Sequence, residues 1–236
     1  MAKKLFSDDD FDKHLSIGDE LCFDKPELKK IKLDLTWAGT DLDICAFMLD
    51  KDGVINDKAD LVYFNSKNRW KTDKDFDDPA FDATKGKIST WPAADFHNPM
   101  KWMSKTLPAS LDGSVIGSWD DMSESDDDEC GETMHVLLEE VNVHKYQSIV
   151  FAAVVAKDRI QDGETFADAK NPVVIIRNAD TDEVIAQYKL AASFAGKDAV
   201  CFGKMVYNPN TFMWNFVPMA AGYNGGMFHL ANEVFS

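Results

Sequence analysis

Short segments of alternating or uniformly apolar residues are the feature that most limits what this chain can fold into. Residues 31–37 alternate apolar and polar side chains, which is the period of a strand with one buried face. Residues 148–155 are nearly all apolar, which is typical of a central strand. We count about nine or ten such segments at close spacing, with one or two marginal helices. The pattern predicts an all-β fold, an antiparallel two-sheet β-sandwich.

The expected elements follow from this pattern and from the turn residues between the segments. Gly39 and Thr40 separate the first two strands, and residues 178–181 form a turn inside the segment 173–188. We predict strands at 31–37, 41–49, 60–65, 133–143, 148–155, on both sides of 178–181, at 199–207 and at 213–218, a short helical turn at 163–169, and a C-terminal helix at 227–235. The run Gly222-Tyr-Asn-Gly-Gly226 resembles a phosphate cradle before a helix, but a turn is the better interpretation.

Residues 67–111 differ from the rest of the chain. They contain Trp70, Trp91 and Trp102, four prolines and little periodicity. Disordered segments are poor in aromatic residues, so part of this insert is expected to pack on the domain or on a partner. The tryptophans either anchor a long loop or form a contact for a protein partner or a second copy of the chain. We predict a charged N-terminal extension over residues 1–14 and one domain over residues 15–236 that contains the insert.

The most acidic stretch of the chain spans residues 119–132. It contains no Lys or Arg and eight carboxylates: Asp120, Asp121, Glu124, Asp126, Asp127, Asp128, Glu129 and Glu132. Like charges at such spacing repel by about 1 kcal/mol per pair even in water. The stretch is either a solvated loop, which local sequence favours, or a site for a hard cation, because Ca²⁺ takes oxygen ligands.

Charge and cysteine usage exclude several classes of protein. The chain has 41 acidic and 25 basic residues, a net charge of −16, which argues against binding to nucleic acid phosphates. No apolar run approaches the roughly 18 residues of a transmembrane segment, and the N-terminus lacks the apolar core of a secretory signal. The four cysteines, Cys22, Cys45, Cys130 and Cys201, are far apart. They predict reduced thiols and a cytoplasmic location.

Catalytic motifs are missing from the sequence. The five histidines have no triad or metal-ligand spacing, and neither a nucleophile-elbow motif nor a phosphate-binding loop motif is present. Cysteines and histidines do not cluster, which argues against zinc. The sequence therefore predicts a protein that is not an enzyme.

Several short motifs, taken in order, resemble one family. They are Gly39-Thr-Asp-Leu-Asp-Ile-Cys-Ala-Phe47, Tyr63-Phe-Asn65, Asp112-Gly-Ser-Val115, Trp119-Asp-Asp121 with its acidic tail, residues 155–158, 165–166 and 175–181, Cys201-Phe-Gly203, and residues 221–226. The ordered set is similar to the TerD family of tellurium-resistance and stress proteins, and it covers residues 15–236 apart from the insert. The resemblance implies a β-sandwich that binds calcium through the acidic loop and the Asp-Leu-Asp segment, with no catalytic reaction.

The resemblance also implies the metal ligands. Asp41 and Asp43 match the aspartate pair, and Asn65 matches an amide on the next strand. The last acidic motif of the family pattern can be aligned with this sequence in two ways, with its glutamate on Glu132 or with the motif on residues 127–129. Both alignments stay open. The candidate ligands are Asp41, Asp43, Asn65, Asp120, Asp121, Asp126, Asp127, Asp128, Glu129 and Glu132. Two aspartates on one strand face, an amide and an acidic loop would supply the six to eight oxygens that a calcium ion takes.

Two functions follow from these expectations. The first is a calcium-binding stress and tellurium-resistance protein that holds one or two Ca²⁺ ions and acts as a scaffold or sensor. The second is a calcium-dependent adhesion or carbohydrate-binding β-sandwich that forms a structural subunit of a larger assembly.

Overall fold

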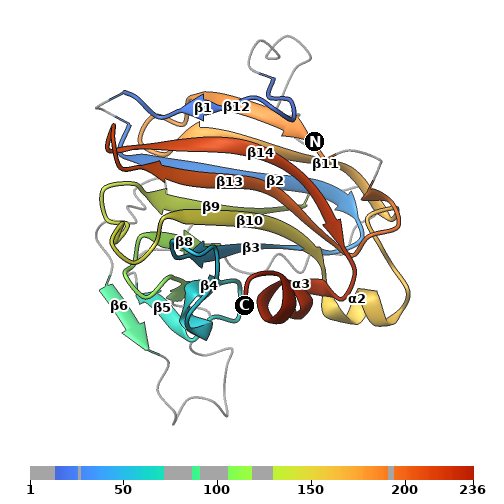
Figure 1. Cartoon of the computed structure of the whole chain (residues 1–236). Coiled ribbons are helices and arrows are strands. Elements are labelled where there is room, and N and C mark those ends of the chain that lie inside the picture. The colour runs from blue at the N-terminus through green and yellow to red at the C-terminus, as the bar shows by residue number, and fades with distance from the viewer. Residues whose placement is uncertain (1–13, 26–27, 72–86, 91–105, 119–129, 191–193) are drawn as a thin grey trace.

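Two large antiparallel sheets, packed face to face, make up most of the computed structural model (Figure 1). The structure describes residues 14–25, 28–71, 87–90, 106–118, 130–190 and 194–236. The first sheet has the spatial order β1 (Leu21–Cys22), β14 (Met213–Tyr223), β13 (Ala199–Asn208), β10 (Ser148–Val155), β3 (Leu42–Leu49) and β4 (Leu61–Val62). The second has the order β12 (Val184–Lys189), β11 (Ala169–Asn178), β2 (Lys30–Gly39), β9 (Cys130–Leu137) and β8 (Val115–Gly117). This arrangement confirms the predicted sandwich.

The core lies between the two sheets, and the sequence periods explain which side chains enter it. Along β2, Ile31, Leu33, Leu35 and Trp37 are buried, whereas the residues between them are partly exposed. All eight residues of β10 are buried because this central strand is covered on both faces. Each large apolar side chain removed from water in this way contributes about 1.5–3 kcal/mol.

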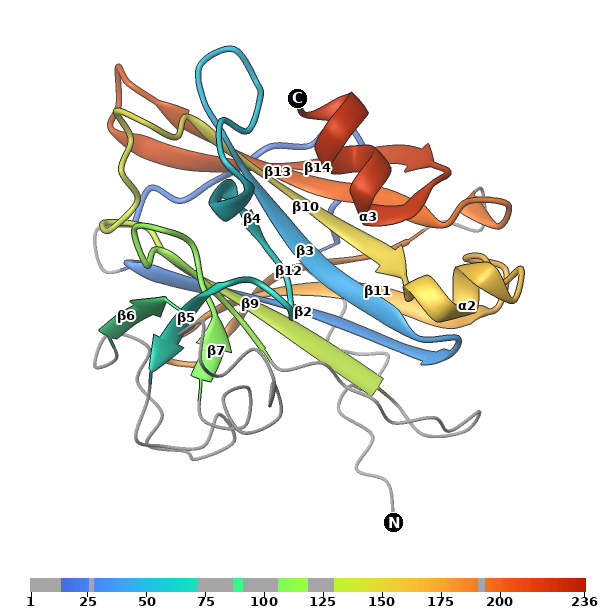
Figure 2. The same cartoon turned by 90° about the horizontal axis from the view of Figure 1, so that it is seen from below.

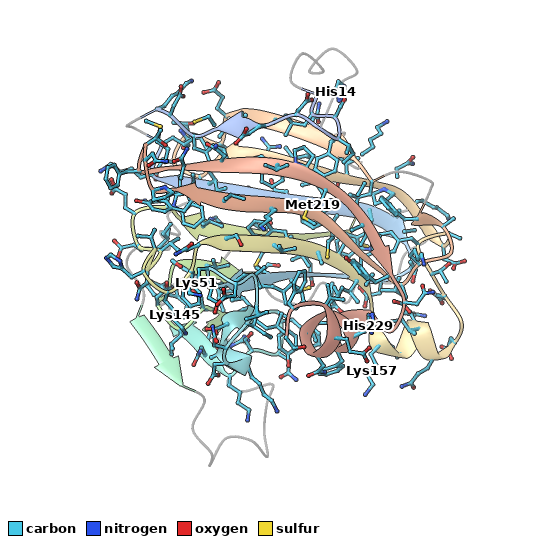
Figure 3. All side chains as sticks on the ribbon, viewed as in Figure 1. His14, Lys51, Lys145, Lys157, Met219 and His229 are labelled. Atoms are coloured by element: carbon cyan, nitrogen blue, oxygen red, sulfur yellow. The ribbon has the colours of Figure 1, made fainter. Side chains whose placement is uncertain are left out.

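The C-terminal segment covers the outer face of the six-stranded sheet. It forms α3 (Gly226–His229), which continues into one π-helical turn, η6 (Leu230–Val234). Phe235 packs on Phe47 of β3, with ring centroids 4.7 Å apart. Figure 2 shows α3 on the outer side of this sheet, and Figure 3 shows Met219 of β14 and His229 on that side. The predicted C-terminal helix is confirmed, and α2 (Lys157–Gln161) is the second short α-helix.

β14 continues through Gly222 and Tyr223, so the glycine-rich run turns only at its end, where a carboxylate of the chain itself binds two amide groups. Gly225 and Gly226 have φ angles of +105° and +63°, which favour glycine. Their N–H groups donate to the two carboxylate oxygens of Asp198, each at 2.9 Å. Asp198 is 8% exposed. The run therefore resembles a phosphate cradle because it binds an anion, and that anion is Asp198.

Three predicted elements differ from the structure. The strand expected at 60–65 consists of Leu61 and Val62 only, because residues 58–60 form a 3₁₀ turn, η2 (Lys58–Asp60), and Ser66 closes a turn by donating its N–H to the carbonyl of Tyr63. The strand expected at 133–143 ends at Leu137, and turns follow. The helical turn expected at 163–169 lies earlier, in α2, and residues 166–168 form a turn without helix.

The region expected to be an irregular insert contributes a third, small sheet. Its order is β6 (Lys87–Thr90), β5 (Asn68–Lys71) and β7 (Thr106–Pro108). Trp70 of β5 is 8% exposed and packs with Leu107, Ala109, Ile116 and Leu137. It is thus an anchor of this sheet and not an exposed binding aromatic. Trp91 and Trp102 lie outside the described residues.

In the described part of the chain, no helix combines the length and the apolar character that crossing a bilayer requires.

Candidate functional site

A tight turn after β2 sets the start of β3, where the predicted aspartates lie. Gly39 has a φ of +89°, and a Cβ atom added there would lie 2.3 Å from the carbonyl oxygen of Asp168. Thr40 donates its N–H to the same oxygen at 3.2 Å. Only glycine fits this close approach, so the turn fixes where the chain enters β3.

Replacing Gly39 with alanine is expected to lower the free energy of unfolding by about 2–3 kcal/mol, because it adds a backbone clash to a strained φ angle. Gly53→Ala is the matched control, since Gly53 has a φ of +81° but no atom within 4 Å of an added Cβ. Urea denaturation of both variants measures the difference. Equal losses would show that the contact with Asp168 does not matter.

Asp41 and Asp43 lie at the beginning of β3 on the outer side of the six-stranded sheet. Leu42 and Ile44, which alternate with them, belong to the core between the sheets. The carbonyl of Asp41 accepts a hydrogen bond from the N–H of Ala156 at 3.0 Å, which keeps this end of β3 against the end of β10. Both aspartates are half-buried. Because successive side chains of a strand point to opposite faces, Asp41 and Asp43 lie on the same face, as expected from their spacing.

Glu132 of β9 reaches the same end of β3 from the opposite sheet. It is 3% exposed, and its Oε2 accepts a hydrogen bond from the N–H of Ile44 at 2.7 Å. β4 pairs with β3 only at Ala46 and Phe47. The backbone N–H of Ile44, the residue after Asp43, is therefore bound by a carboxylate from the opposite sheet and not by a neighbouring strand.

The pKa of the Cys45 thiol depends on the carboxylates at the start of β3. Burial raises the pKa of Cys45 well above its ordinary value, and the neighbouring Cys201 thiol and the negative charges of Asp43 and Glu132 raise it further. Asp43 and Glu132 therefore both act on one thiol. Cys45 stays a neutral, packed side chain and not a thiolate nucleophile.

Asn65, the fourth described candidate, follows β4 in the chain. It is exposed in the turn between β4 and β5, and it has no hydrogen bond to Asp41 or Asp43 in the described structure. The buried guanidinium of Arg69 holds this turn by donating to the carbonyls of Phe64 at 2.6 Å and Ser66 at 3.5 Å. Burial lowers the pKa of Arg69 to about 10, so it remains charged at neutral pH.

The remaining candidate ligands fall outside the described residues. They are Asp120, Asp121, Asp126, Asp127, Asp128 and Glu129. Within the described ranges alone, no three His, Cys, Asp or Glu side chains are grouped closely enough to hold a metal ion. The described donors, Asp41, Asp43 and Glu132, are hard carboxylate oxygens, which fit a calcium ion by their chemistry.

Sequence reasoning did not find two further polar clusters, because their members are far apart in the chain. Asp60 is fully buried and bonds to Lys145 and Tyr146. A pocket of 830 Å³ opens beside Asn65 and includes Asn68. The only local signal was the acidic and amide-rich composition of residues 56–68.

A family model and a curated relative match this chain. The TerD domain family model matches residues 13–75 and 106–234. General stress protein 16U of Bacillus subtilis (strain 168) is 29% identical over 126 residues, which is 51% of this chain and 60% of that relative. The aligned part thus spans about 60% of the curated relative's length.

Solved structures give the same architecture. A homologue of the telluride resistance protein TerD from Streptomyces coelicolor A3(2) superposes with a TM-score of 0.55 and 18% identity, over 89% of this chain and 98% of that chain. A protein of unknown function gives a TM-score of 0.52 and 20% identity, over 86% and 95%. At these identities the likeness concerns the fold alone.

The chain is a two-sheet β-sandwich with carboxylates of both sheets near the start of β3. The family match covers well over half of the chain and includes both the Asp-Leu-Asp segment and Glu132. The chain belongs to the TerD family.

Proposed function

We propose that this protein is a calcium-binding, non-enzymatic TerD-family member that acts as a scaffold or sensor in the response to stress, including tellurium compounds. The observation that carries the proposal is the hydrogen bond between the Glu132 carboxylate and the amide of Ile44. It brings the end of the acidic stretch to the residue beside Asp43. The names of the similar proteins, a general stress protein and a telluride resistance homologue, support the stress role. A cytoplasmic location remains part of the same proposal.

Electrostatics supplies the reason for an ion at this place. A buried carboxylate costs several kcal/mol unless hydrogen bonds or a positive charge compensate it. Glu132 and Asp43 bring two negative charges to one end of β3, and the chain as a whole carries −16. A bound calcium ion would neutralise this charge and tie β3 to the acidic stretch. Asp41, Asp43 and Glu132 would hold it together with carboxylates of residues 119–129, and Asn65 stays a candidate.

Thermal unfolding of the full chain in calcium and in EGTA tests the proposal. At a calcium concentration of 100 times Kd, binding stabilises the folded state by about 2.7 kcal/mol. For a chain of this size that raises the midpoint by about 5–10 °C. A midpoint that is the same in calcium and in EGTA would contradict calcium binding.

Two isosteric variants connect the shift to the site. Asp43→Asn and Glu132→Gln each remove one charge and keep the shape, so both are expected to lose most of the calcium-dependent shift. In EGTA, Asp43→Asn should melt at or above the wild-type midpoint because one repulsion is gone. Asp162→Asn is the control, since Asp162 is an exposed acid at the end of α2 and should keep the full shift. A full shift in both site variants would place the ion elsewhere.

A further inference from the structure

A pocket beside η2 carries polar groups, of which only Asn65 is also a candidate calcium ligand. It lies between η2 and the turn from β4 to β5, and its volume is 830 Å³. This is within the range of about 300–1,000 Å³ that is usual for small-molecule sites. The side chains that matter for the argument are Lys58, Leu61, Tyr63, Asn65 and Asn68.

The carboxamide of Asn68 is the observation that points to a ligand. Asn68 is 8% exposed, and among the described residues only its backbone carbonyl takes part in a hydrogen bond outside the strands, from Ala109. Its carboxamide has no hydrogen-bond partner in that part of the protein. The oxygen and nitrogen of this carboxamide are not among the partnerless polar atoms that are closed off from water, and Asn68 lines the pocket. A ligand in the pocket would replace water as the partner of the amide.

Two more polar groups line the pocket, on the half-buried Tyr63 and the exposed Asn65. The hydroxyl of Tyr63 and the carboxamide of Asn65 have no hydrogen bond with the described residues. Burial raises the pKa of Tyr63, so its side chain remains a neutral hydroxyl at physiological pH. Lys58 adds an exposed ammonium group that forms no ion pair within the described structure.

The chemistry of these groups selects the ligand. A carboxamide donates and accepts hydrogen bonds at once, and so does a hydroxyl. Asn65, Asn68 and Tyr63 therefore match a molecule that carries several hydroxyl groups around an apolar ring face. Leu61 and the ring of Tyr63 provide apolar surface for that face. Lys58 favours a ligand that also carries an acidic group.

The pocket is held in shape before any ligand arrives. Arg69 fixes the turn through the carbonyls of Phe64 and Ser66, and its Nη2 donates to the carbonyl of Thr106 at 2.8 Å. The hydroxyl of Ser66 accepts the N–H of Tyr63 at 3.0 Å. A site whose supporting contacts are already made loses less entropy when it binds.

We propose that this pocket is a binding site for a short saccharide, recognised by Tyr63, Asn65 and Asn68. The proposal goes beyond calcium binding, and two of its three residues are not candidate calcium ligands. Asn68 and Tyr63 therefore test the saccharide site independently of the ion.

A glycan array that displays neutral and acidic saccharides is the first test, with the labelled full-length chain as the probe, in calcium and in EGTA. Wild-type protein is expected to retain a defined set of saccharides. The strongest soluble one is then titrated by calorimetry against variants. Asn68→Leu is expected to weaken its binding by about tenfold or more, because donor and acceptor are both lost.

Stability distinguishes a binding group from a structural one. Because leucine has a similar volume and the Asn68 carboxamide bonds to no described residue, Asn68→Leu should melt close to the wild-type temperature. Tyr63→Phe removes only the hydroxyl and serves as a second variant, with weaker binding and an unchanged midpoint expected. Asn210→Leu, at the exposed tip of the β13–β14 hairpin, is the matched control and should bind as wild type does.

Three results would overturn the proposal. They are an array on which no saccharide is retained above background, unchanged affinity in both Asn68→Leu and Tyr63→Phe, and a loss of affinity as large in Asn210→Leu as in the pocket variants. A missing calcium shift in the melting experiment would contradict the ion site only, since Asn68 and Tyr63 are not proposed as its ligands.

Discussion

Replacing Asp60 with alanine is expected to lower the free energy of unfolding by about 3–5 kcal/mol. Asp60 is fully buried, and both carboxylate oxygens have two partners. Oδ1 accepts from Nζ of Lys145 at 2.8 Å and from the hydroxyl of Tyr146 at 2.5 Å, and Oδ2 accepts from the backbone N–H groups of Asn56 and Asp57 at 3.1 and 2.9 Å. The carboxylate thus joins the η2 turn to the segment before β10.

The size of the effect comes from the groups that alanine would leave behind. Tyr146 is 1% exposed, so its hydroxyl would lose its acceptor in a site with little access to water. The Lys145 side chain is 35% exposed and can turn towards water, so the loss of its ion pair contributes less to the destabilisation. Figure 3 shows Lys145 at the surface near β4, which agrees with that limit. Chemical denaturation at neutral pH measures the loss.

The same carboxylate predicts a dependence on pH. Burial alone would raise the pKa of Asp60, but hydrogen bonds from Lys145 and Tyr146 outweigh it and hold the pKa below its ordinary value. A group whose pKa is lowered by folding stabilises the protein above its unfolded pKa, about 3.9 for Asp, and loses this contribution as the pH falls through the folded value. The difference between wild type and Asp60→Asn should therefore be the same at pH 7 and pH 5 and shrink below pH 4.

Asp180→Ala is the control for this prediction. Asp180 pairs with Lys30 at 2.9 Å, but its side chain is 47% exposed, so its loss should cost less than about 1 kcal/mol. Equal losses for Asp60→Ala and Asp180→Ala would contradict the importance of burial.

Replacing Asp198 with alanine is expected to cost about 3 kcal/mol, the second largest effect. The change leaves two backbone N–H groups, those of Gly225 and Gly226, without their acceptor at 2.9 Å. Gly226 is buried, so water cannot fully replace the carboxylate. Because these amides begin α3, the covering of the outer sheet face by the C-terminal segment depends on this carboxylate.

Hydrogen exchange locates the effect of Asp198 within the molecule. In Asp198→Ala, exchange should accelerate at Gly225, Gly226 and the following helical residues before the rest of the sandwich is affected. Asp198→Asn keeps one oxygen acceptor and should show an intermediate loss of stability. Uniform acceleration across both sheets would show that the C-terminal segment does not depend on this contact separately.

How much of the fold the sequence predicts depends on where each segment finds its partners. β2 and β10 were predicted nearly to their ends because their side-chain period directly reflects which faces are buried. The segment 60–65 was predicted as one strand, yet side-chain hydrogen bonds of Asp60 and Ser66 shorten it to two residues. The pattern of apolar residues does not show where side chains compete with a neighbouring strand for backbone hydrogen bonds.

The candidate site was predictable to a similar extent. The spacing of Asp41 and Asp43 indicated their common side of the strand from the sequence alone. The contact of Glu132 with Ile44 joins residues 88 positions apart, and it follows from the packing of two sheets that no local pattern specifies. Asn68 gave no signal at all, because an asparagine matters here only through its burial and its lack of a partner.

The hydrogen bond between Glu132 and Ile44 also bears on how molecules of this protein meet one another. An amide at an uncovered strand edge offers a starting point for a strand from a second molecule, and such pairing leads to aggregation. At Ile44 the amide is already bound by a side chain that carries a negative charge and is itself buried. A foreign strand would have to displace that carboxylate first, so one glutamate protects this margin against intermolecular sheet growth.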